Sequence, residues 1–173
     1  MRRNYVHSLF DVVLQDSWLF NGTVRENIVF NRVGVDDEKV MWACDSVGLR
    51  QFVESLPEGL DTIITDKLAL SGGQKQQMMI ARMLIRDAPM VILDEATATI
   101  DTLTERNIQH AMEILTEGKT SFVIAHRLST IMDSDLIIVI KDGTIIEQGT
   151  HDQLLDNRGF YHSLYNSQFE NCA

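Results

Sequence analysis

The sequence has few of the residues that would indicate secretion, membrane insertion or binding to nucleic acid. It holds 2 cysteines among 173 residues, so we expect no disulfide framework and a reducing compartment. Its longest strongly apolar run, residues 136–140, is far shorter than the about 20 residues that span a bilayer. No apolar segment follows the basic residues 2–3, as it would in a signal peptide. The formal net charge of −10 gives no attraction to nucleic acid or to an anionic membrane.

One phosphate-binding motif is also missing. No Gly-x-x-x-x-Gly-Lys-[Ser/Thr] sequence, the usual cradle for nucleotide phosphates, occurs in the chain. What is present indicates one globular domain, because 45% of the residues are hydrophobic and 23% are charged.

The order of expected elements predicts an α/β fold with an inserted all-helical subdomain. Strands are predicted at residues 9–14, 90–93, 122–125 and 136–140, and Asp142-Gly143 predicts a hairpin turn into residues 144–147. Capping patterns predict helices near Thr23, Asp36, Ser71, Thr102 and Thr150, with a further helix at residues 49–56. The apolar density of the strands predicts burial on both faces, as in a parallel sheet.

Two adjacent carboxylates follow one of these strands. Asp94 and Glu95 come at the end of an apolar run, which places them at the carboxyl edge of the sheet, where open α/β sheets bind ligands. Asp94 is a candidate ligand of Mg²⁺, and Glu95 a candidate to polarise an attacking water. The segment alone is equally consistent with an acidic strand end that is merely solvated.

The segment Ser71-Gly72-Gly73-Gln74 predicts an anion site at the start of a helix. Free backbone N–H groups at a helix start bind phosphate, and glycine lets the ligand come close. The alternative is a plain helix start with Ser71 as its cap. Two glycines in the first turn cost roughly 1 kcal/mol each relative to alanine, which favours a functional reason.

Two further polar residues follow predicted strands. His126 comes directly after residues 122–125 and is a candidate to donate a hydrogen bond to a phosphate. Gln15 follows the first strand and is a candidate to contact Mg²⁺ or water through its amide oxygen. A structural histidine and an ordinary polar strand end remain the alternatives.

Taken in order, these segments resemble the nucleotide-binding domain of an ABC transporter. Residues 13–16 are similar to the Q-loop, residues 70–74 to the signature motif, and residues 90–95 to Walker B. Residues 98–101 resemble the D-loop and residues 124–127 the H-loop. Residues 20–28 and 145–151 resemble the exporter branch most closely, in which this domain usually follows a transmembrane domain on the same polypeptide.

The resemblance implies a P-loop NTPase (RecA-like) core that lacks its N-terminal strands. It implies three parts: residues 1–15 as the end of the core lobe, 16–86 as the helical subdomain, and 87–173 as the rest of the core. Two such domains stack head to tail and trap ATP with Mg²⁺, at the cytoplasmic face of the membrane and against a transmembrane domain. The P-loop is expected before Met1.

The resemblance also implies a role for each matching residue. Glu95 is the catalytic carboxylate, Asp94 the Mg²⁺ partner and His126 the γ-phosphate switch. Gln15 contacts Mg²⁺ and links the site to the membrane domain, while Asp101 crosses the dimer interface. The signature residues bind the nucleotide of the partner domain, with Ser71 and Gly73 on its γ-phosphate: Leu70, Ser71, Gly72, Gly73 and Gln74.

The expected function is therefore ATP-driven transport, carried out by a protein of which this chain is one part. Two alternatives stay open. One is a non-catalytic module that lends its signature residues to an intact ATPase partner. The other is a gene fragment without independent function, since missing strands would leave sheet edges unpaired.

Overall fold

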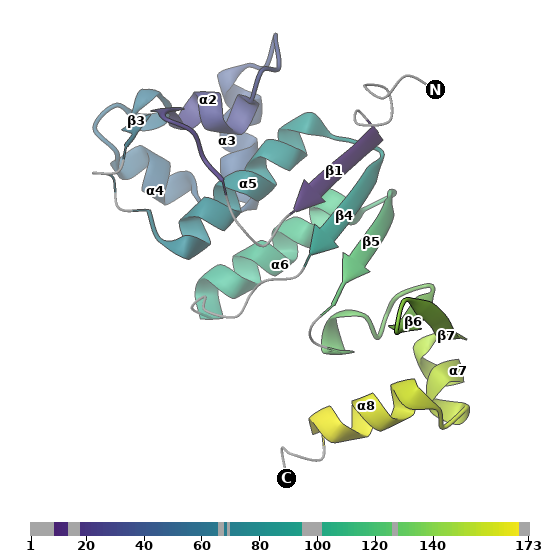
Figure 1. Cartoon of the computed structure of the whole chain (residues 1–173). Coiled ribbons are helices and arrows are strands. Elements are labelled where there is room, and N and C mark those ends of the chain that lie inside the picture. The colour runs from purple at the N-terminus through teal and green to yellow at the C-terminus, as the bar shows by residue number, and fades with distance from the viewer. Residues whose placement is uncertain are drawn as a thin grey trace. The chain divides into compact units, whose positions relative to one another are not determined.

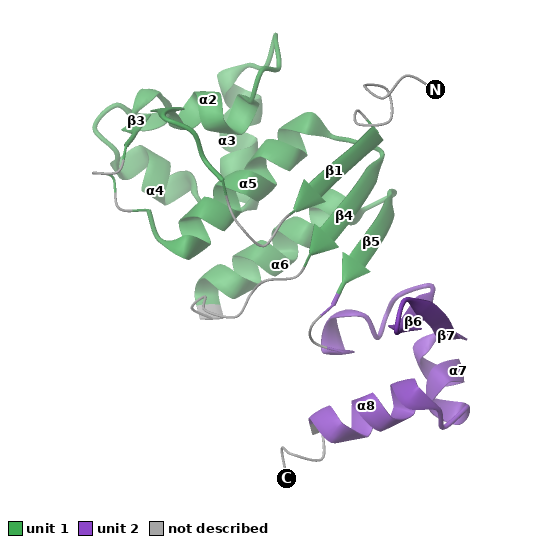
Figure 2. Cartoon of the chain, in the orientation of Figure 1, with its two compact units in different colours: residues 1–124 green, residues 125–173 purple. Residues whose placement is uncertain are grey.

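The structure, a computed structural model, describes residues 9–13, 18–65, 68, 70–94, 102–125 and 128–169. The chain divides into two compact units, Met1–Ile124 and Ala125–Ala173, which are coloured separately in Figure 2. Each unit is described by itself. In the described part of the chain, no helix combines the length and the apolar character needed to cross a bilayer.

The first unit is built on a three-stranded parallel sheet. Its strands are β1 (Phe10–Val13), β4 (Met90–Asp94) and β5 (Thr120–Ile124), in the order β1-β4-β5. Helices α5 (Gly72–Arg86) and α6 (Thr102–Thr116) pack on this sheet, as Figure 1 shows. These elements confirm the α/β fold class and the first three predicted strands.

The prediction that the strands are buried on both faces is wrong. Alternate residues of the sheet, such as Val13 and Val91, are buried in the main core with α5 and α6. The residues between them face the other way, and Val12, Phe122 and Ile124 are 40%, 50% and 54% exposed. The pattern arises because no described element of this unit covers the second face.

Between β1 and α5 lies the predicted helical part. It contains α2 (Val24–Val29), α3 (Asp37–Ser46), α4 (Arg50–Ser55) and the 3₁₀ turn η1 (Gly59–Asp61). The strands β2 (Gly22–Thr23) and β3 (Ile63–Ile64), which the sequence did not predict, form a short antiparallel pair. The caps at Thr23 and Asp36 are confirmed, since each side chain accepts from a backbone N–H of the first turn. Thr102 is instead the first residue of α6.

The second unit is a hairpin with two helices. Strands β6 (Ile137–Lys141) and β7 (Thr144–Gly149) pair with each other in a separate two-stranded sheet. The strand predicted at residues 136–140 is therefore present as β6, but it does not join the parallel sheet. The turn between them is the predicted one: Asp142 and Gly143 have φ of 50° and 76°, which suits a two-residue hairpin. The capping box at Thr150 starts α7 (His151–Asp156), and α8 (Phe160–Phe169) follows. Leu154 and Tyr161 are buried against the hairpin.

Candidate functional site

The predicted anion site is a well-formed helix start. Ser71 is the N-cap of α5, and its Oγ accepts from the N–H of Gln74 at 3.1 Å. The side chain of Gln74 reaches back, and its Oε1 accepts from the N–H of Ser71 at 3.0 Å. This reciprocal pair is a capping box, and it fixes the path of the chain into the helix. Ser71-x-x-Gln74 has the same spacing as Thr150-x-x-Gln153, and this spacing is the signal in the sequence for the role of Gln74 in the cap.

Two N–H groups remain for a ligand. The first intrahelical bond runs from the N–H of Lys75 to the carbonyl of Ser71 at 3.1 Å, and Gln74 is satisfied by the cap. The N–H groups of Gly72 and Gly73 precede that bond and have no acceptor among the described residues. Gly72 is exposed, and apart from its chain neighbours and the backbone of its own helix no atom lies within 4 Å of the place that a Cβ would take there, whereas Gly73 is buried. An anion can approach the helix start at Gly72, at the positive end of the helix dipole.

The predicted metal ligand lies at the carboxyl end of the sheet. Asp94 is the last residue of β4 and is half-buried. The registers Val13↔Leu93 and Asp94↔Ile124 show that all three parallel strands end at the same edge. Figure 1 shows that α5 and α6 begin on the side of the sheet at which these strands end. The described residues thus place one carboxylate and one open helix start on one side of the first unit.

Four of the predicted site residues lie outside the described residues: Gln15, Glu95, Asp101 and His126. Three of them follow β1, β4 and β5 within two residues in the sequence. Among the described residues, no group of three or more carboxylates, histidines or cysteines is arranged to hold a metal ion. A single carboxylate such as Asp94 is chemically compatible with Mg²⁺, which takes few protein carboxylates and keeps several other ligands.

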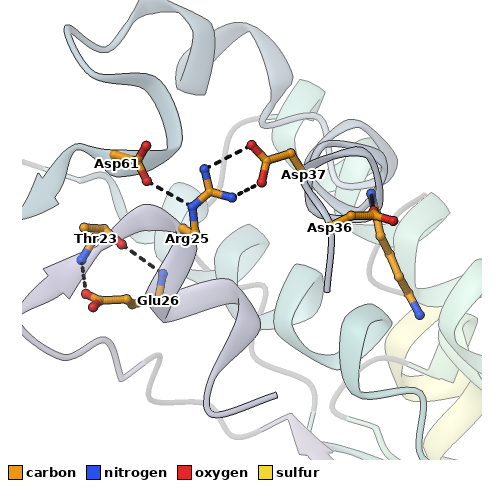
Figure 3. Close-up of polar contacts among 7 residues, drawn as sticks. Thr23, Arg25, Glu26, Asp36, Asp37 and Asp61 are labelled. Atoms are coloured by element: carbon orange, nitrogen blue, oxygen red, sulfur yellow. Dashed lines mark hydrogen bonds and ion pairs between the residues drawn. The ribbon is translucent and has the colours of Figure 1, made fainter. Parts of the chain in front are cut away.

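A cluster of charges ties the segment after β1 to the segment before α5. Arg25, in α2, donates from Nε to Oδ1 of Asp61 at 2.9 Å and pairs through its two terminal nitrogens with the carboxylate of Asp37 (Figure 3). Both carboxylates raise the pKa of Arg25 above its usual value. The N–H of Val24 also donates to the carbonyl of Thr62 at 3.0 Å, beside the β2–β3 pair. Asp61 and Thr62 are thereby bound to α2.

A second, buried network joins α2 to α5, and the sequence pattern did not predict it. Asn27 is fully buried, and its side chain bonds to both the N–H and the carbonyl of Phe20, each at 3.0 Å. Arg82, in α5, donates from Nε to the carbonyl of Asn27 at 2.7 Å and lies over the ring of Phe30. Burial lowers the pKa of Arg82. The available signal was a lone arginine within the apolar run of residues 78–85.

The chain is similar to known proteins in both sequence and structure. The model of the ABC transporter family matches residues 2–98. A solved structure of a bacterial Atm1-family ABC exporter with ATP bound is similar over 96% of this chain, at 40% sequence identity and a TM-score of 0.84. The matched region makes up 29% of that chain.

Relatives with similar sequences are also named as ATP-binding or ATP-dependent transport proteins. An uncharacterized ABC transporter ATP-binding protein of Bacillus subtilis (strain 168), YfiC, is 51% identical over 91% of this chain. The ATP-dependent lipid A-core flippase of Coxiella burnetii is 46% identical over 97% of this chain. These matches cover 26% and 29% of the two relatives, so the chain spans between a quarter and a third of their length.

Proposed function

This chain belongs to the ABC transporter family, and from that premise we propose that it supplies the signature motif and the Mg²⁺-binding carboxylate of an exporter's ATP-binding domain. In the whole protein, ATP bound between two such domains drives transport through a transmembrane partner. The similarity to exporter proteins over nearly all of the chain supports the exporter assignment.

The observation that carries the proposal is the start of α5. Its capping box leaves the N–H groups of Gly72 and Gly73 without an acceptor among the described residues, with Gly72 exposed and Gly73 buried, at the positive end of a 15-residue helix. A structural helix start would gain stability from alanine at these positions, roughly 1 kcal/mol each. Glycine at both is explained by a phosphate that must approach the backbone closely.

We assign the remaining roles residue by residue. Asp94 holds Mg²⁺, and Glu95, which follows it, orients and polarises the attacking water. His126 contacts the γ-phosphate, Gln15 contacts Mg²⁺ and communicates with the transmembrane partner, and Asp101 crosses to the second domain. When bound with the nucleotide, Mg²⁺ neutralises charge on the phosphate oxygens.

The given sequence holds no P-loop, the cradle that binds nucleotide phosphates. Without that cradle and its lysine, this chain cannot position the β- and γ-phosphates for attack. We propose that its signature residues act on a nucleotide held by the P-loop of another domain. This role holds whether the chain works as part of a longer protein or as a separate, non-catalytic module.

The test is association with an intact ATP-binding domain. The chain is immobilised at low density, and binding of a hydrolysis-deficient ATP-binding domain from a related exporter is measured with ATP and with no nucleotide. We expect ATP-dependent binding that Ser71→Arg abolishes by filling the phosphate position. Ser55→Arg, an exposed serine at the end of α4, is the matched control and should bind like the unmodified chain. Equal binding with and without ATP, or equal binding by both variants, would refute the proposal.

A further inference from the structure

The side chain of Asn27 is a junction between three segments of the first unit. Its Nδ2 donates to the carbonyls of Phe20 and Thr23 at 3.0 and 3.1 Å, and its Oδ1 accepts from the N–H of Phe20 at 3.0 Å. The backbone of Phe20, at the end of residues 18–20, is therefore held at both its donor and its acceptor. Asn27 cannot move without carrying this segment with it.

The third segment that meets at Asn27 is α5, which contributes Arg82. Arg82 donates from Nε to the carbonyl of Asn27 at 2.7 Å, and its Nη2 lies 3.4 Å from the Oδ1 of Asn27. The guanidinium carbon also lies 4.6 Å from the centroid of the Phe30 ring, at the end of α2. Arg82 is 9% exposed, and within the described residues no carboxylate pairs with it. Its bonds to Asn27 and the ring of Phe30 are what compensate its burial.

Burying an arginine without a carboxylate partner costs free energy, because its charge loses contact with water. Leucine or methionine would pack at this position of an otherwise apolar helix face without desolvating a charge. Unlike leucine or methionine, arginine makes directional hydrogen bonds. Its planar guanidinium group fixes the angle as well as the distance between the groups that it binds. The arrangement therefore favours a role in orientation over a role in stability.

The helix that Arg82 orients is the one that begins with the phosphate-binding glycines. Ser71 and Arg82 belong to one uninterrupted helix and its cap, about 16 Å apart along the axis at 1.5 Å per residue. A small rotation of α5 about its contact with Asn27 is magnified at that distance. The directions of the N–H groups of Gly72 and Gly73 then depend on the junction.

We propose that Arg82 is a positioning residue for the signature motif. Through Asn27, it fixes the direction of α5 relative to residues 18–20, which follow the Gln15 segment almost directly in the sequence. Displacement of that segment redirects the two glycine N–H groups, and binding of a phosphate at the glycines orders residues 18–20 in return. The proposal rests on the proposed function for its phosphate ligand, but the mechanical link is testable without nucleotide.

The first experiment measures the link in the chain alone. Spin labels are placed at Asn21 and Lys75, both exposed, in a background with Cys44→Ala and Cys172→Ser. Dilution with unlabelled chain removes distances between molecules. We expect a narrow distance distribution that broadens in Arg82→Lys, which keeps the charge but loses the fork. Arg50→Lys alters an arginine that pairs with Asp45 and Glu54 at the surface, and it should leave the distribution narrow.

A second control separates orientation from stability. Val53→Ala, at a buried position in α4, destabilises the same unit without touching the junction. It should lower the melting temperature but leave the distance distribution narrow. If Arg82→Lys gives a distribution as narrow as Val53→Ala, or if both broaden equally, the positioning role is overturned.

The second experiment adds the ligand. In the immobilised-chain assay, Arg82→Lys should weaken ATP-dependent association by about fivefold or more, a typical coupling between sites, while Val53→Ala and Arg50→Lys leave it unchanged. Unchanged affinity for Arg82→Lys would count against the inference. Absence of ATP-dependent association in the unmodified chain would instead refute the proposed function, and the spin-label result would then decide the inference by itself.

Discussion

Replacing Ser71 by aspartate should separate the stability of α5 from its function. Aspartate and asparagine are both good N-caps, so Ser71→Asp and Ser71→Asn each keep a side-chain oxygen for the N–H of Gln74. The two variants have nearly the same shape and differ in one negative charge. That charge lies at the positive end of the helix dipole, where it stabilises the helix by about 0.3–1 kcal/mol.

The same charge is unfavourable for a phosphate at this position. A ligand bound to the N–H groups of Gly72 and Gly73 would lie beside the cap, and two like unit charges about 4 Å apart repel by about 4 kcal/mol at an effective dielectric constant of 20. This corresponds to about a thousandfold loss of affinity, since each 1.4 kcal/mol is about tenfold. Ser71→Asp should therefore melt at a temperature equal to or above that of Ser71→Asn, yet lose ATP-dependent association.

Two measurements test this reasoning. Thermal unfolding gives the sign of the effect on stability, and the immobilised-chain assay gives the affinity. Raising the salt concentration should recover part of the affinity of Ser71→Asp, because exposed charges are screened. If the two variants associate equally in ATP, no phosphate binds at this helix start. If Ser71→Asp fails only because it unfolds, the description of Ser71 as a cap is wrong.

Three further outcomes are expected. Purified chain should release phosphate from ATP no faster than Glu95→Gln, since it has no P-loop; turnover above that variant would reveal another phosphate site. The chain should self-associate through its open sheet face, and Phe122→Lys, at a half-exposed position of that face, should reduce this; a monodisperse monomer at tens of micromolar in sedimentation would contradict it. In a Cys172→Ser background, Cys44 should resist a thiol reagent at neutral pH until the chain unfolds, because burial raises the pKa of its thiol to about 11; rapid labelling of the folded chain would disprove its burial.

Local patterns in the sequence predicted the helix starts well. The caps at Asp36 and Ser71 and the box at Thr150 are confirmed, because each depends on residues at most three apart. The turn at Asp142 is confirmed for the same reason, since two residues determine its type. The predicted start of the helix near Thr102 was wrong by one residue, since Thr102 is the first residue of α6 and not the cap before it. The pattern Thr-x-x-Glu does not distinguish these two positions.

Features that depend on distant partners were not predicted. The burial of strands was overestimated because apolar composition does not reveal whether a second layer is available to cover Phe122 and Ile124. The junction of Asn27 with Arg82 joins residues 55 apart, and each residue alone is consistent with an ordinary polar position on a helix. In the candidate site, the structure confirms that Ser71 caps a helix and that Asp94 ends a strand. The functional roles of these two residues stay predictions, as do those of Gln15, Glu95, Asp101 and His126.

The register of the parallel sheet has a consequence for synthesis on the ribosome. Phe10 pairs with Met90, so β1 emerges about 80 residues before its partner strand does. At 5–20 residues per second, this leaves β1 without β4 for about 4–16 s. The helical segment between them is made of local contacts and has time to form first, whereas the sheet must close a long loop. In a growing polypeptide, Val12 and Val13 thus lack their β4 partners during this interval, and molecular chaperones that bind short apolar stretches can reach this strand before β4 pairs with it.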